Sequence, residues 1–115
     1  MIYEPFSIVV VPFPFTDTSQ TKKRPAIVLS TKNHQEQTEH ITLLMITSAK
    51  HSAWTTDYPI KNLAETGLSV PSIIRQKIFT LDQRLILSKI GCLSRNDRIA
   101  VLTLLKKHLQ LLSEE

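Results

Sequence analysis

Basic and hydroxyl side chains stand at the ends of several apolar segments of this sequence. Arg24 directly precedes one such segment, and Thr47 and Ser48 close the next one. Arg75 and Lys77 are two residues apart, so they share a face if their segment is a strand. Arginine can bind two phosphate oxygens with its planar guanidinium, and a threonine hydroxyl can donate to a third. If the strands are neighbours, these residues predict a phosphate-binding site.

A site of this composition suits cleavage of RNA, because the substrate itself supplies the nucleophile. The 2′-hydroxyl attacks the adjacent phosphorus and the 5′-oxygen leaves, so neither a protein nucleophile nor a metal ion is needed. The protein must align the reacting atoms, move two protons and stabilise the extra charge on phosphorus. Each of these residues is also common on strand surfaces. Their types therefore indicate phosphate binding and do not establish catalysis alone.

Composition and spacing argue against other classes of site. The only glycines are Gly67 and Gly91, so the chain has no glycine-rich phosphate loop. Its four histidines and one cysteine do not form the spacings HxH, HExxH or CxxC, and we expect no metal site and no cofactor. Cys92 is the single cysteine and cannot form an internal disulfide, which fits a reducing compartment.

The charge distribution predicts a polyanionic partner. The chain has 14 Lys and Arg against 10 Asp and Glu, a net charge of +4. Three basic residues are consecutive at positions 22–24, and Arg75 lies close to Lys77. A basic face that only keeps the protein soluble is the alternative. No apolar run approaches the roughly 18 residues of a membrane span, so we expect a cytoplasmic protein without a membrane partner.

The elements that position these residues follow from the hydrophobic pattern. Strands are predicted at residues 8–11, 25–30, 41–47, 57–60 and 70–79. The second of these is apolar throughout its middle, which predicts burial on both faces.

The connections between these strands read as turns and loops. We expect an extended segment at residues 12–15, polar connections at 16–23, 31–40 and 48–56, and a helical turn at 62–66 that Gly67 ends. Residues 85–92 fit either a strand or a short helix.

The last segment is the clearest helix. Ser94 can cap its N-terminus, with Asp97 three residues later. Apolar residues recur at helical spacing on one side, and polar residues fall on the other: Val101, Leu102, Leu105, Leu109 and Leu112 against Lys106, Lys107 and Gln110. Short strands followed by this helix predict a single α+β domain, residues 1–115, built on a small curved antiparallel sheet.

Four segments together resemble the MazF/PemK (Kid) family of toxins of type II toxin–antitoxin systems. They are residues 8–17 (IVVVPFPFTD), 23–30 (KRPAIVLS), 46–48 (ITS) and 71–82 (PSIIRQKIFTLD). A fifth segment, 90–94 (IGCLS), resembles the family's approach to its last helix. The segments have the family's order and spacing and cover nearly the whole chain.

The resemblance implies a small SH3-like antiparallel β-barrel of the CcdB/MazF type with a C-terminal α-helix, usually as a homodimer. It implies a sequence-specific, metal-independent endoribonuclease that cleaves single-stranded mRNA, leaves a 2′,3′-cyclic phosphate and arrests growth. A cognate antitoxin, often with an acidic C-terminal segment, is expected to cover the RNA groove. Contact with operator DNA is expected only through the toxin–antitoxin complex.

The resemblance also assigns roles to residues. Arg24 matches the arginine taken to contact the scissile phosphate, Thr47 matches the strand-end threonine, and Arg75 falls where some members place a second catalytic arginine. Candidate RNA-binding residues surround these three: Thr16, Lys22, Lys23, Ser48, His51, Trp54 and Lys77. Trp54, the only tryptophan, is either a base-stacking residue or a packing anchor.

Two departures from the family pattern leave the general base open. Lys77 stands where aspartate, a proposed proton acceptor, is frequent, and Phe6 and Ser7 replace a frequent Gly-Asp pair. A lysine with a lowered pKa, or His51, could take the acceptor's place. Two other functions also stay open. One is a non-nuclease toxin of the gyrase-poison type, and the other, motivated by Lys77, is an RNA-binding homologue that has lost catalysis.

Overall fold

Each segment predicted as a strand is a strand in the computed structural model, which describes residues 1–12, 22–50 and 53–111. The strands of the described part form one antiparallel sheet in the order β4-β5-β3-β2-β1-β6. Their bounds are β1 (Ser7–Pro12), β2 (Lys23–Val28), β3 (His40–Ser48), β4 (Tyr58–Pro59), β5 (Ser72–Asp82) and β6 (Ser88–Cys92). The helical elements are α1 (Lys32–Thr38), the 3-10 turn η1 (Gln83–Leu85) and α2 (Arg95–Leu109).

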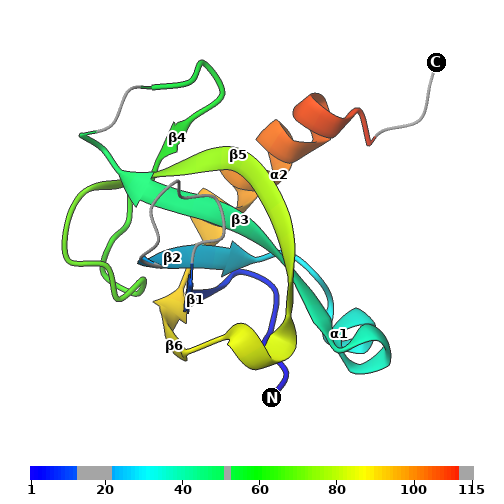
Figure 1. Cartoon of the computed structure of the whole chain (residues 1–115). Coiled ribbons are helices and arrows are strands. Elements are labelled where there is room, and N and C mark those ends of the chain that lie inside the picture. The colour runs from blue at the N-terminus through cyan, green and yellow to red at the C-terminus, as the bar shows by residue number, and fades with distance from the viewer. Residues whose placement is uncertain (13–21, 51–52, 112–115) are drawn as a thin grey trace.

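The sheet is strongly curved and forms a half-barrel, with α2 against one face (Figure 1). β5, the longest strand, bends across the sheet and pairs with both β3 and β4. This architecture confirms the predicted small α+β fold, a curved antiparallel sheet followed by a C-terminal helix. Neither described α-helix has the length and hydropathy that crossing a bilayer requires.

Alternation along the strands divides the apolar core between the two faces of the sheet. Val9, Ala26 and Met45 belong to the core on one face, whereas Ile27 and Leu44 belong to the core beneath α2. The predicted burial of the second strand on both faces is confirmed, because Ala26 and Ile27 are both fully buried. The β2–β3 region is therefore buried on both faces at the centre of the sheet.

One prediction about the connecting segments is wrong, and one segment that was left open is now assigned. Residues 31–40, expected as a polar connection, contain helix α1, which Thr31 caps by accepting a hydrogen bond from the backbone N–H of His34. Residues 85–92, left between strand and helix, finish the 3-10 turn and then form β6. At Gly67 the expected conformation is confirmed, since its φ is +77° and a Cβ there would approach Ile90 O to 2.2 Å.

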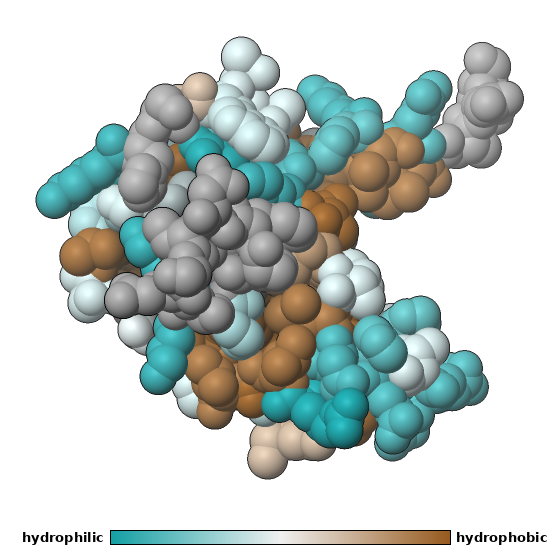
Figure 2. Space-filling view, in the orientation of Figure 1, coloured by the Kyte–Doolittle hydropathy of each residue, from teal (hydrophilic) through white to brown (hydrophobic). Residues whose placement is uncertain are grey.

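The last helix was predicted to bury one apolar side, and only part of that side is buried. Val101 and Leu105 are buried against the sheet, but Leu102 and Leu109 are exposed. Apolar surface accordingly remains visible along α2 (Figure 2). Leu112 lies outside the described residues.

Asp97 fixes the start of α2 to the segment around β4. The side chain of Ser94 accepts a hydrogen bond from the backbone N–H of Asp97, as the sequence predicts. The buried carboxylate of Asp97 in turn accepts hydrogen bonds from the Tyr58 hydroxyl (2.6 Å) and from the backbone N–H groups of Asn62 (3.0 Å) and Lys61 (3.3 Å). One carboxylate therefore joins the helix to the chain that precedes β5.

Asp97→Asn will lower the free energy of unfolding by about 2–4 kcal/mol, because an amide cannot accept all of these bonds and leaves buried donors unpaired. Burial raises the pKa of Asp97, but the hydrogen bonds from Tyr58, Asn62, Lys61 and Ser94 outweigh it and hold the pKa below its ordinary 3.8. The stabilisation is therefore complete above about pH 4 and lost as the pH falls further.

Urea denaturation at pH 7 and pH 3 gives the free energy of unfolding of both proteins, and so measures the loss caused by Asp97→Asn and its dependence on pH. The exposed Asn96, in the same helical turn as Asp97, gives a control, since Asn96→Ala should stay within about 0.5 kcal/mol of wild type. An Asp97→Asn protein as stable as wild type at pH 7 would show that Asp97 does not hold the helix.

Candidate active site

Arg24 and Thr47 lie on neighbouring strands in the centre of the sheet. β2 pairs with β3 up to Ala26 and Met45; Arg24 is two residues before Ala26 and Thr47 two residues after Met45, at the same end of the two strands. Thr47 is buried and Arg24 is half-buried. Both residues line one cavity of about 390 Å³. The structure therefore brings these two predicted site residues together.

The cavity combines basic, hydroxyl and apolar groups. Lys23 joins Arg24 on the basic side, and Ser48 lies beside Thr47. Leu68 belongs to the loop that lines one side of the cavity, and other apolar residues also line it: Val10, Ile46, Val70 and Ile90. None of the described residues that line it is acidic. An anion with an attached flat, apolar group would match these surroundings.

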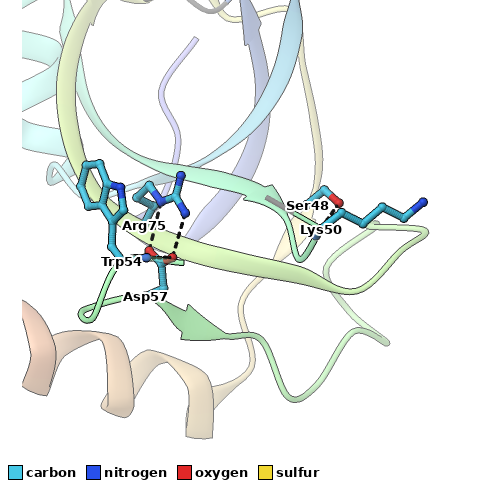
Figure 3. A network of polar contacts seen from close by, with 5 residues as sticks. All are labelled: Ser48, Lys50, Trp54, Asp57 and Arg75. Carbon is cyan, nitrogen blue, oxygen red and sulfur yellow. Dashed lines mark hydrogen bonds and ion pairs between the residues drawn. The ribbon is translucent and has the colours of Figure 1, made fainter. Parts of the chain in front are cut away.

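Arg75 lies on β5, the strand next to β3, and forms a network with Trp54 and Asp57 of the loop before β4 (Figure 3). Its Nε donates to Asp57 Oδ1 at 3.1 Å and its Nη2 to Asp57 Oδ2 at 2.9 Å. The backbone N–H of Trp54 donates to the same Asp57 Oδ2 at 2.7 Å. The Arg75 guanidinium lies over the indole, with Cζ 4.9 Å from the ring centroid.

Both partners of this ion pair stay charged at neutral pH. The hydrogen bonds from Arg75 lower the pKa of Asp57, although burial acts in the opposite direction. The hydrogen bond to Asp57 likewise raises the pKa of Arg75. Asp57 is therefore an ionised acceptor engaged with Arg75, and the Nε–Nη2 edge of Arg75 faces Asp57 rather than an incoming phosphate.

Arg75 is close to the Arg24–Thr47 cavity along the sheet. It pairs with Met45 of β3, and Thr47 is two residues further on the same face of that strand, about 7 Å away along its axis. Between Met45 and Leu44 the register shifts, so Gln76 and Lys77 fall outside the regular pairing. Arg75 and Lys77 were predicted to share one face of a regular strand. The strand is irregular at this point, and Lys77 is half-buried.

The sequence model of PemK-like, MazF-like toxins of type II toxin–antitoxin systems matches residues 4–109. The chain belongs to this family. The resemblance seen in the sequence is thus confirmed over almost all of the protein. Comparison with curated protein sequences gave no significant match.

Solved structures of MazF proteins share the fold of this toxin. MazF from Deinococcus radiodurans, crystal form I, superposes with a TM-score of 0.76 at 18% identity, covering 96% of this chain and 99% of that one. The Mycobacterium tuberculosis toxin MazF-mt6 gives 0.72 at 19% identity, covering 93% and 99%. An endoribonuclease in complex with its cognate antitoxin, from a mycobacterial species, gives 0.75 at 12% identity, covering 98% of each chain.

Among the remaining predicted RNA-binding residues of the toxin, the structure describes Ser48, which lines the cavity, and Lys22, which directly precedes the cavity residue Lys23. Lys22 is exposed just before β2, and Ser48 accepts a hydrogen bond from the backbone N–H of Lys50 at 3.2 Å. In Figure 3 Ser48, the last residue of β3, and Lys50, two residues beyond it, stand apart from the Trp54 network. Thr16 and His51 lie outside the described residues.

A second cavity of the toxin, of about 500 Å³, lies at α1 and η1 and contains none of the predicted site residues. Glu36 and Glu39 line it, and its Arg84 is bonded to Asp82, with Nη2 2.8 Å from Oδ2. This mixture of charges does not suit a polyanion. Within the described residues, no group of three or more His, Cys, Asp or Glu side chains is placed to hold a metal ion.

Asp57 is the residue of the site that sequence reasoning missed. The available signal was an acidic residue three positions after the only tryptophan and at the first position of a predicted strand. That spacing did not reveal its partner, because Arg75 is 18 residues away in the sequence.

Proposed function

We propose that the toxin is a sequence-specific endoribonuclease that cleaves single-stranded mRNA without a metal ion. The observation that carries the proposal is the shared cavity of Arg24 and Thr47, to which the described part of the chain contributes basic and hydroxyl groups but no acidic ones. Such surroundings favour a phosphodiester. Membership of the PemK/MazF family supports the same reading.

The reaction requires little covalent chemistry from the protein. The ribose 2′-oxygen forms a bond to the adjacent phosphorus, the bond from phosphorus to the 5′-oxygen breaks, and the products are a 2′,3′-cyclic phosphate and a 5′-hydroxyl. Arg24 binds the non-bridging oxygens and stabilises the charge that develops on them, and the Thr47 hydroxyl donates to the same group. Fixing the phosphate in line with the 2′-oxygen supplies the rest of the acceleration.

Two protons must also move. The 2′-hydroxyl proton passes to a base, and the departing 5′-oxygen takes up a proton. Asp57 is unsuited to the first task, because Arg75 lowers its pKa and occupies both of its oxygens. Lys77 and His51 are the candidates that the sequence offers. The family resemblance implies a catalytic arginine at Arg75, whereas its ion pair with Asp57 fits a role in holding the site together.

The proposed partners follow from the family and from charge. We assign a cognate antitoxin whose acidic segment covers the basic cavity, because the toxin carries a net charge of +4 and relatives have been solved as MazE–MazF complexes. The toxin acts as a homodimer in the cytoplasm, away from membranes. It reaches operator DNA only inside the complex with the antitoxin.

The test uses purified wild-type toxin, a single-stranded RNA of varied sequence and excess EDTA. We expect cleavage at a short recurring sequence, with a 2′,3′-cyclic phosphate and a 5′-hydroxyl detected by mass spectrometry. A gyrase supercoiling assay runs in parallel and should be unaffected. Intact RNA together with inhibited supercoiling would instead identify a gyrase poison. Salt-sensitive binding of RNA that stays whole would identify a homologue without catalysis.

A further inference from the structure

We infer that Asp57 is a positioning residue that, together with Arg75, holds Trp54 as a stacking platform for the RNA base next to the cleaved phosphodiester. The inference rests on the proposed RNA cleavage and adds to it a recognition element. It assigns to Arg75 the role of supporting Trp54, in agreement with the contacts of its guanidinium with Asp57 and the indole.

Asp57 links the two parts of the platform through three hydrogen bonds. Two come from the Arg75 side chain and one from the Trp54 backbone, at 3.1, 2.9 and 2.7 Å. The side chains of Arg75 and Asp57 are only 10% and 6% exposed. A buried ion pair keeps one geometry, because loss of either partner leaves an uncompensated charge. The loop that carries Trp54 is therefore fixed to β5.

Trp54 keeps a large exposed surface in this fixed position. Its ring lies over Arg75, yet 44% of the residue is exposed. The guanidinium lies against one side of the indole, so the exposed surface is directed away from Arg75. An indole held in this way offers a flat aromatic face to a second planar group. Stacking of one base on such a face changes affinity by roughly 5- to 150-fold.

The position of the platform selects a base adjacent to the scissile phosphate. Arg75, against which Trp54 lies, is opposite Met45 on β3, and Met45 is two residues, about 7 Å along that strand, from Thr47, so the platform is on the strand next to the Thr47 end of the cavity. Asp57 also neutralises Arg75. The contact that Trp54 offers is therefore aromatic rather than cationic, which favours a nucleobase over an acidic peptide side chain.

The fluorescence of Trp54 reports on the platform directly, because it is the only tryptophan of the chain. The probe is a 2′-O-methyl oligonucleotide with the sequence that wild-type toxin cleaves, which binds without reacting. We expect this oligonucleotide to quench the Trp54 fluorescence and to shift its emission. Poly-glutamate of the same length should leave both unchanged. Quenching by poly-glutamate alone would assign the platform to an acidic peptide and overturn the inference.

Three variants separate positioning from folding. Trp54→Ala and Asp57→Asn should each raise KM for RNA cleavage by roughly 5- to 150-fold, with a smaller change in kcat. Trp54→Phe should recover part of the loss, because an aromatic ring is retained. If Asp57→Asn does not fold, as judged by circular dichroism, the variants of the exposed Trp54 still show through their KM values whether the indole binds RNA.

A matched control breaks a similar ion pair at the other end of the sheet. Asp82 binds Arg84 through Nε and Nη2 at 3.1 and 2.8 Å, so Asp82→Asn removes a two-bond carboxylate–arginine contact of the same geometry, on the exposed surface and far from Trp54. Its KM should equal that of wild type. If the wild type cleaves RNA and Trp54→Ala has the same KM, the stacking platform is wrong but the proposed function stands. If the wild type does not cleave RNA, the proposed function itself is wrong.

Discussion

An RNA that carries a single 2′-deoxynucleotide on the 5′ side of the cleaved bond will not be cut by the toxin. The proposed reaction takes its nucleophile from that ribose, and no protein group replaces the missing oxygen. Binding should change little, because the basic and hydroxyl groups of the cavity interact with the phosphate that remains. Gel analysis of cleavage and fluorescence anisotropy of binding, on the same labelled oligonucleotide, measure the two quantities separately.

The control for this substrate places the 2′-deoxynucleotide on the 3′ side of the same bond. That change leaves the attacking hydroxyl in place, so cleavage should proceed. Cleavage of the first substrate, by contrast, would show that water or a protein side chain attacks the phosphorus. The reaction proposed for Arg24 and Thr47 would then be wrong, even if both residues bind RNA.

Arg24→Ala is the protein variant with the largest expected effect on activity. It removes the guanidinium that stabilises charge on the phosphate, and loss of one such group typically lowers the rate by about 10²–10³-fold. The effect should appear in kcat/KM under single-turnover conditions. The fold should survive, since Arg24 is half-buried at the start of β2 and the core residues of the strand follow it.

Arg84→Ala is the matched control for Arg24→Ala. Arg84 is an exposed arginine whose side-chain partner is Asp82, and it lines the other cavity. Its removal subtracts the same charge without touching the proposed site, so kcat/KM should stay close to the wild-type value. Cleavage at the wild-type rate by a folded Arg24→Ala protein would remove Arg24 from the mechanism.

The strands up to β5 and the last helix could be predicted because their signals are local. β-Branched runs define the central strands, and the Ser94–Asp97 cap sets the start of α2. That Arg24 and Thr47 lie close together could also be predicted from their positions in the sequence. Each residue stands at the end of a strongly apolar strand, and consecutive strands of an antiparallel sheet tend to be neighbours.

The parts that could not be predicted depend on contacts between distant residues. Helix α1 has no apolar stripe; its one buried residue, Gln35, bonds to the backbone of Tyr3 and Ser30. The exposure of Leu102 and Leu109 follows from the single line along which α2 touches the sheet. Helical spacing predicts an apolar side of the helix but not how much of it the sheet covers.

The site shows the same limit. The ion pair of Asp57 with Arg75 joins a loop to a strand, and the shifted register beside Arg75 is a property of the β3–β5 pairing. Neither leaves a periodic signal in the sequence. The residues that carry the proposed chemistry were therefore visible from their types, whereas the residue that positions Trp54 became visible only through the fold.

A double-mutant cycle of Arg24→Ala and Thr47→Val tests the central claim most directly, with kcat/KM for a single RNA substrate as the measured quantity. If both side chains act on one phosphate, the double variant will lose much less than the product of the two single losses, a coupling of about 1–3 kcal/mol. Losses that multiply, with no coupling, would contradict a shared phosphodiester and separate the two residues into independent sites.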